Sequence, residues 1–234
     1  MITVRVTTPF DDAITGEHYS AERLLDLDDP QRVMKMAKLG LVQLVHIDAP
    51  RPKSGTRVMV YQNLLFAIGG IETADYQLAR AFADHDIVFV FRTADIEQGL
   101  RLAQYCEVQI DDGAMPLEAD VVILANYDSL DYCKGRLKAK KIYQQVHADW
   151  ANMKKMWQWA NFKWKPDECV DAVLAVSETT VKALQTAFDE PINAVLVPNI
   201  LNLDKVRNTR KPVSSGGFKM FGTNTALIGS SKAV

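Results

Sequence analysis

Short apolar runs alternate with amphipathic segments along most of the chain, and this alternation predicts an α/β fold. Apolar residues at helical spacing follow several of the runs, most clearly Ala74, Leu78, Ala79 and Phe82. Strands that alternate with helices favour a mostly parallel, Rossmann-like sheet covered on both faces. The runs of strand length after the first fifty residues are 57–62, 87–91, 106–110, 121–125, 141–146, 172–176 and 194–198.

Changes in texture divide the chain into four parts. Residues 1–48 read as strand, polar turn, strand, helix and strand, a small α+β module in which Asp28 or Asp29 caps the helix and Gly40 ends it. Pro, Gly and Ser mark 49–56 as a linker, and 57–208 form the Rossmann-like domain. The Ser-, Gly- and Thr-rich end, 209–234, has no useful period and is predicted to be a disordered tail.

A glycine pair joins the strand at 57–62 to the helix that begins near Ile71. Gly69 and Gly70 allow close approach of a ligand to the backbone, and the N-terminus of the helix offers unpaired N–H groups to an anion. The pattern therefore predicts a phosphate site. A plain connection between a strand and a helix has the same sequence pattern and stays open as the alternative.

Three further motifs follow apolar runs: VH at 146–147, VSE at 176–178 and VPN at 197–199. Together with GGIE at 69–72, and in this order, they resemble the N-terminal domain of the family 4 glycosyltransferases, which are retaining enzymes of the two-domain GT-B fold. The resemblance covers about 57–204. Residues 1–48 have a shorter resemblance to small N-terminal modules of phage and prophage proteins.

The resemblance implies a site at the carboxyl ends of the strands. His147 corresponds to the histidine beside the reaction centre, where a structural histidine is the alternative. Capping of the next helix explains Ser177 and Glu178 equally well, and a hinge explains Asn199. The residues expected to bind the donor diphosphate or the substrate are Gly69, Gly70, Ile71, Glu72, Asn126, Ser177, Glu178 and Asn199. The expected ligands are a nucleoside diphosphate sugar and a glycan, lipid or protein acceptor, with no metal or other cofactor.

The four tryptophans lie together between Trp150 and Trp164, next to several lysines. This composition suits a peripheral membrane contact or a platform for a sugar ring, and a buried helical face is the alternative. The basic run at 134–141 fits either anionic lipid or a solvated loop. We expect a cytoplasmic protein, peripheral at most to the inner membrane face.

Charge and motif content exclude other classes. The net charge of −2 provides no basic excess for nucleic acid, and three widely spaced cysteines indicate reduced thiols. The D-x-D at 84–86 falls between a helix and a strand, at the edge away from the ligands, and is predicted to be a turn.

The chain also departs from the family pattern. No two glutamates have the seven-residue separation of the family's second domain. We therefore expect a truncated or split enzyme, whose donor-nucleotide domain is missing or lies in a separate chain. A non-catalytic, phage-associated module that binds a carbohydrate or acceptor is the alternative.

Overall fold

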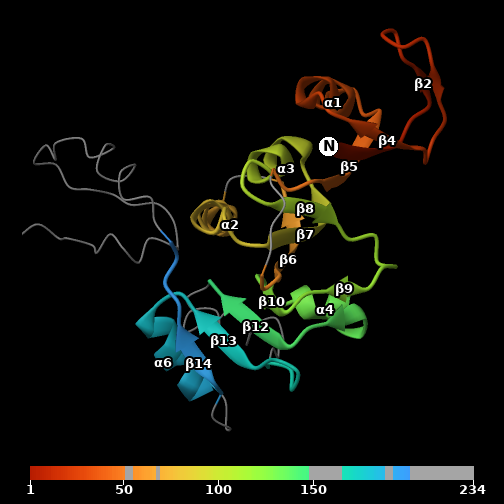
Figure 1. The fold of residues 1–234 in the computed structure, drawn as a ribbon. Helices are drawn as coiled ribbons and strands as arrows, with labels where there is room; N and C mark the ends of the chain where they lie inside the picture. Colours follow the sequence, from red (N-terminus) through yellow and green to blue (C-terminus); the bar gives the residue numbers. More distant parts are fainter. Residues whose placement is uncertain (51–54, 67–68, 148–164, 188–191, 201–234) are drawn as a thin grey trace, which may run out of the picture.

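The computed structural model describes residues 1–50, 55–66, 69–147, 165–187 and 192–200. Within these residues, ten strands form one sheet in the order β14-β13-β12-β10-β6-β7-β8-β5-β1-β4 (Figure 1). The predicted mixed α/β fold with a large, mostly parallel sheet is confirmed. The tryptophan segment and the tail lie outside the described residues, so their predicted roles stay predictions.

The parallel part of the sheet runs from β14 to β8. Each of its strands matches one of the predicted apolar runs. The cause is clearest in β7, whose first five residues are all buried, because a strand covered on both faces needs apolar side chains at every position. These strands are β6 (Val58–Leu65), β7 (Ile87–Ala94), β8 (Glu107–Ile110), β10 (Val121–Leu124), β12 (Lys141–Val146), β13 (Ala172–Ala175) and β14 (Ala194–Leu196).

The N-terminal segment continues this sheet in antiparallel fashion. Strand β5 (Val42–Ile47) pairs with β8, β1 (Ile2–Val6) pairs with β5, and β4 (Leu24–Leu27) forms the edge. Strands β2 (Phe10–Asp11) and β3 (His18–Tyr19) form a small hairpin that projects from the body in Figure 1. The division of the chain into domains stays a prediction, but segments 1–48 and 57–125 share one sheet and one apolar cluster.

Local sequence explains the helix between β4 and β5. Helix α1 (Pro30–Lys38) begins after Asp29, whose carboxylate accepts hydrogen bonds from the backbone of Gln31 and Arg32 at 2.9 and 3.2 Å. Gly40, with a φ of +68°, follows its end. Both the predicted cap and the predicted stop are confirmed.

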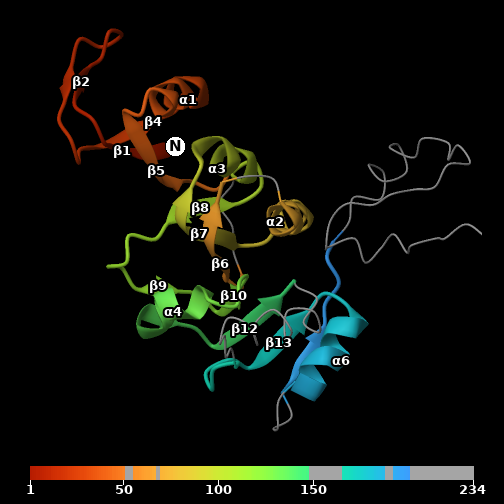
Figure 2. The same ribbon diagram turned by 180° about the vertical axis from the view of Figure 1, so that it is seen from behind.

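Helices cover the two faces of the sheet separately (Figures 1 and 2). Helix α2 (Gly70–Ala81), α3 (Ile96–Leu102) and α1 pack on the face that carries Val60 and Phe89. Helix α4 (Ser129–Cys133) packs on the opposite face, with Met59 and Val88. The remaining elements are the 3-10 turn η1 (Lys134–Arg136), the paired β9 (Leu117–Glu118) and β11 (Leu137–Lys138), and α6 (Glu178–Ala187) beside β13.

The order of the strands reverses direction next to β6. The chain passes from β6 to β7 and β8 on one side, and then returns to β10 on the other side. In open parallel sheets, ligands bind outside the carboxyl ends of the strands at such a reversal. The fold therefore predicts a ligand site at the carboxyl ends of β6 and β10. Among the described helices, none has the length and apolar character needed to cross a membrane.

Candidate functional site

The predicted site residues all follow the carboxyl ends of parallel strands. Gly69 and Gly70 come after β6, Asn126 after β10 and His147 after β12. Because these three strands are neighbours in the sheet, their ends meet at one edge. Ser177 and Glu178 follow β13, and Asn199 follows β14, further along the same edge.

The glycine pair forms the start of α2. Gly69 has a φ of −100°, which any residue can adopt, so backbone strain does not require glycine there. A Cβ on Gly69 would instead lie 2.5 Å from Oε2 of Glu72. That oxygen accepts a hydrogen bond from the Gly69 backbone N–H at 3.0 Å. The Glu72 carboxylate thus occupies the position at the helix N-terminus that an anion would take, and Ile71 beside it is partly exposed.

His147 is buried at the carboxyl edge. Its side chain is 8 % exposed, and neither ring nitrogen has a hydrogen-bond partner among the described residues. Burial lowers the pKa of the imidazole from 6.5 to about 4. The ring is therefore neutral near pH 7, with one nitrogen able to donate and the other able to accept.

Several elements that end or begin at this edge carry buried polar atoms without partners. Within the described part of the chain, they belong to Gln62, Asn63, Asp75, His147 and Asn199. Gln62 and Asn63 lie in the last residues of β6, His147 and Asn199 follow β12 and β14, and Asp75 lies in the helix that begins at this edge. Because buried polar groups in proteins are nearly always hydrogen-bonded, each unpartnered atom indicates a place for water or a ligand.

Asp75 is a residue that sequence reasoning missed. Its side chain is 2 % exposed and Oδ2 has no partner among the described residues. Burial, and secondarily the charge of Glu72, raise the pKa of this carboxyl well above its usual range. The signal was present in the sequence, because an aspartate stands between Ala74 and Leu78 on a helical face that is otherwise apolar.

The polar residues after β13 and β10 are occupied by local structure. Ser177 Oγ accepts the backbone N–H of Thr180 at 3.1 Å and lies 2.9 Å from its hydroxyl, so it caps α6. The Asn126 backbone N–H donates to Ser129 at 3.2 Å, and its carbonyl accepts from Gln144 at 2.6 Å. The capping alternative accounts for Ser177, and ligand contacts of Ser177, Glu178 and Asn126 stay predictions.

The basic run at 134–141 is paired with acids. Lys134 bonds Asp167 at 2.6 Å, and Lys141 bonds Asp171 at 2.6 Å. The other cations are paired with Asp111, Glu118 and Asp120. A run whose charges are already compensated has little surplus attraction for anionic lipid. The run is also not a plain loop, because it forms η1, β11 and the start of β12.

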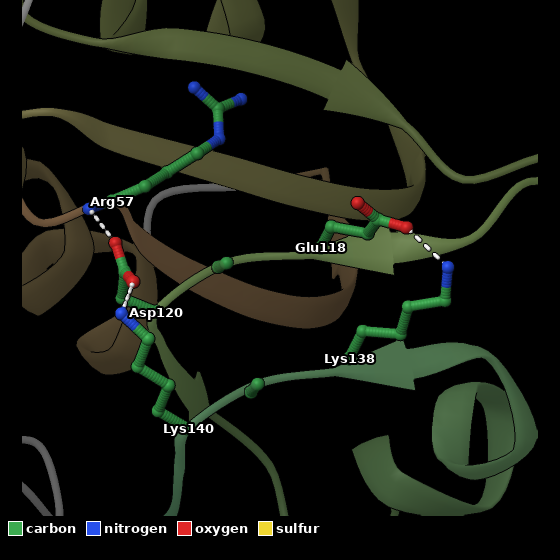
Figure 3. Close-up of a pocket in the computed structure, with 7 residues that line it drawn as sticks. Arg57, Glu118, Asp120, Lys138 and Lys140 are labelled. Carbon is green, nitrogen blue, oxygen red and sulfur yellow. Dashed lines mark hydrogen bonds and ion pairs between the residues drawn. The ribbon is translucent and has the colours of Figure 1, made fainter.

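A hollow of about 450 Å³ lies at the opposite, amino edge of the sheet (Figure 3). Its charged groups bond one another: Lys140 pairs with Asp120 at 2.7 Å, and the same aspartate accepts the Arg57 backbone N–H at 2.9 Å. The predicted turn at Asp84–Asp86 also lies at this edge, where Asp86 bonds Arg57 at 3.2 Å. Among the described residues, none that lines this hollow has a buried side-chain polar atom without a hydrogen-bond partner, whereas the carboxyl edge has several.

The structure defines the chain as an α/β protein with a Rossmann-like, mostly parallel sheet. No protein-family model matches the chain, and none of the curated proteins matches it in sequence. Two solved structures are similar: Anabaena Alr3699/HepE in complex with UDP-glucose, and the same protein in complex with UDP and glucose. Each is 11 % identical with a TM-score of 0.44, over 64 % of this chain and 45 % or 46 % of that chain. The match thus spans less than half of that protein, and a likeness of this size assigns no function.

Proposed function

We propose that this chain supplies the acceptor-side half of a retaining glycosyltransferase, which transfers a sugar from a nucleoside diphosphate sugar to a glycan, lipid or protein acceptor. The observation that carries the proposal is the set of unpartnered buried polar atoms on elements that end or begin at the carboxyl edge, beside the strand-order reversal. The order of the four motifs, GGIE, VH, VSE and VPN, supports it through their resemblance to family 4.

The proposed roles follow from chemistry. Neutral His147 donates or accepts a hydrogen bond at a hydroxyl of the sugar or acceptor, and Asp75 and Gln62 extend the polar lining. The donor diphosphate lies at the start of α2, where the backbone of Gly69 and Gly70 faces it after the Glu72 carboxylate has moved aside. No metal takes part, because backbone N–H groups and the helix dipole stabilise the departing diphosphate.

Binding of the donor is the first test. A nucleotide sugar at about a hundred times its dissociation constant should stabilise the chain by roughly 2.7 kcal/mol, measured by urea unfolding. Gly70→Val, at an exposed first residue of α2, should abolish the effect and keep the fold. Gly135→Val is the matched control, because a Cβ there meets nothing within 4 Å. Equal stabilisation of the Gly70→Val variant and the parent would remove the glycine pair from the site.

A non-catalytic carbohydrate-binding module is the second candidate. The observation in its favour is Glu72, which fills the anion position at the start of α2 with the chain's own carboxylate. Incubation with labelled UDP-glucose, with and without glycan acceptors, separates the two functions. Binding of glycans without release of UDP would favour the carbohydrate-binding module.

A further inference from the structure

Strands β6 and β7 extend beyond their neighbours at the carboxyl edge. Strand β10 pairs with β6 as far as Leu124–Tyr61, and β8 pairs with β7 as far as Ile110–Phe91. Pairing between β6 and β7 continues to Leu65–Ala94. Residues 63 and 92 therefore lie in a two-stranded projection, at a level where both flanking strands have ended.

Asn63 and Arg92 belong to one face of this projection. Met59 and Tyr61 on β6, and Val88 and Val90 on β7, all pack in the cluster on the α4 face. Because side chains alternate along a strand, Asn63 and Arg92 follow these two rows, whereas Leu65 and Ala94 beyond them pack in the cluster on the α2 face. They lie between the paired residues 62–91 and 64–93, and so are neighbours across the two strands.

Tyr132 holds the Arg92 side chain from α4. The guanidinium carbon lies 3.9 Å from the centre of the Tyr132 ring, and the tyrosine is 43 % exposed. Such stacking fixes the guanidinium while leaving its N–H groups available. Within the described residues, Arg92 takes part in no ion pair of 4 Å or less.

The acid that follows the neighbouring strand is already occupied. Asp111, after β8, accepts two hydrogen bonds from Arg136 at 2.6 and 2.5 Å, one from the Tyr61 hydroxyl at 2.7 Å, and one from the Gly113 backbone N–H at 2.9 Å. One arginine thus neutralises Asp111, and the positive charge of Arg92 is left over at the edge.

Asn63 adds an unfilled acceptor beside this cation. Its side chain is 7 % exposed, and Oδ1 is buried without a partner among the described residues. A hydroxyl or N–H of a ligand would satisfy that oxygen. A guanidinium fork matches a phosphate or a carboxylate. The pair therefore suits a molecule with an anionic group next to a hydroxyl.

We infer that Arg92, held on Tyr132, and Asn63 form a subsite for an anionic sugar, in which Arg92 binds a phosphate or carboxylate and Asn63 accepts a hydrogen bond from a sugar hydroxyl. The binding of an anionic sugar does not depend on the proposed function. Only the role of that sugar as the acceptor rests on it. The subsite lies on the α4 face, opposite the face that α2 covers. Donor and acceptor would thus approach the carboxyl edge from different faces of the sheet.

Calorimetric titration with three sugars tests the subsite. Glucose 6-phosphate carries the phosphate, glucuronate carries the carboxylate, and glucose is the neutral reference. The chain should bind at least one of the two anionic sugars more tightly than glucose, and the tighter of them identifies the anion. Arg92→Gln should weaken that binding about tenfold or more, because a charge-assisted hydrogen bond is lost.

Matched variants separate the subsite from net charge. Arg101 on α3 also stacks on a tyrosine, with its guanidinium carbon 4.4 Å from the centre of the Tyr76 ring, but on the other face of the sheet. Arg101→Gln removes the same charge and should leave the affinity unchanged. Tyr132→Phe should keep the affinity because the ring remains, and Tyr132→Leu should reduce it.

Several results would overturn the inference: no preference of the parent for either anionic sugar over glucose, equal affinity in Arg92→Gln, or equal losses in the Arg92 and Arg101 variants. UDP-glucose titrated in parallel keeps the two proposals apart. Binding of an anionic sugar without any nucleotide sugar would uphold the subsite and refute the diphosphate site at the start of α2. The reverse result would refute the subsite alone.

Discussion

Replacement of His147 by Gln should change how stability depends on pH. In the folded protein, burial lowers the pKa of His147 from 6.5 to about 4. Between pH 6.5 and pH 4, His147 is protonated in the unfolded chain but stays neutral in the folded chain. The parent therefore loses stability as the pH falls from 6.5 towards 4. At about 1.4 kcal/mol per pH unit, the full loss is on the order of 3 kcal/mol.

Urea unfolding of the parent and of His147→Gln, at intervals from pH 7.5 to pH 4.5, measures this effect. The difference in unfolding free energy between the two proteins should shift in favour of the variant by on the order of 2 to 3 kcal/mol over that range. Other titrating groups are common to both proteins and cancel in the difference. His85→Gln, at an exposed histidine of the turn after α2, is the control for the loss of a histidine.

If the difference in unfolding free energy between the parent and His147→Gln did not change with pH, burial would not lower the pKa of His147. That result would mean that the imidazole is solvated or paired in the folded protein, contrary to its burial at the end of β12. A histidine that reaches water would be partly protonated near its unperturbed pKa of about 6.5, so its proposed hydrogen bonds to a hydroxyl would then depend on pH.

Three further substitutions test individual residues of the site and its support. Asp75→Leu should raise the unfolding free energy at pH 7 by on the order of 2 kcal/mol, because an unsatisfied buried carboxyl destabilises the fold, and it should weaken ligand binding, because that carboxyl lines the site. Only the folded parent keeps the proton on Asp75, so the unfolding free energy of the parent, but not of the variant, should fall as the pH rises from 3.8 towards the raised pKa of Asp75. Glu72→Gln keeps the helix cap but removes a negative charge, so calorimetry should show severalfold tighter binding of a nucleoside diphosphate; an unchanged affinity would place the anion elsewhere. Asp111→Asn should cost on the order of 3 kcal/mol in urea unfolding, because it leaves the Arg136 charge without its partner, and a loss below 1 kcal/mol would contradict that role.

Local patterns predicted the elements of the fold well. The apolar runs correspond to the parallel strands, and Asp29 and Gly40 mark the two ends of α1. These features are determined by residues close together in the chain, so local sequence patterns are enough to predict them. The junction after β6 was predicted in the same way, and α2 begins at Gly70.

Features that depend on distant residues could not be predicted. Pairing of β5 with β8 joins residues 46–47 to 108–109, and no local pattern reports that contact across an apparent linker. The acids that neutralise the basic run are 20 to 33 residues away in all five of its pairs. Burial of Asp75 likewise depends on how α2 packs against the sheet, not on spacing alone.

Hydrogen exchange of the chain, measured by mass spectrometry with and without a saturating nucleotide sugar, tests the location of the site most directly. We expect protection in peptides that contain Gly69–Glu72 and Val146–His147, which follow neighbouring strands at the carboxyl edge. Peptides that contain Asp120 and Lys140 line the hollow at the amino edge and should be unchanged. Protection confined to the amino edge, or no protection at all, would contradict a ligand site at the carboxyl ends of β6, β10 and β12.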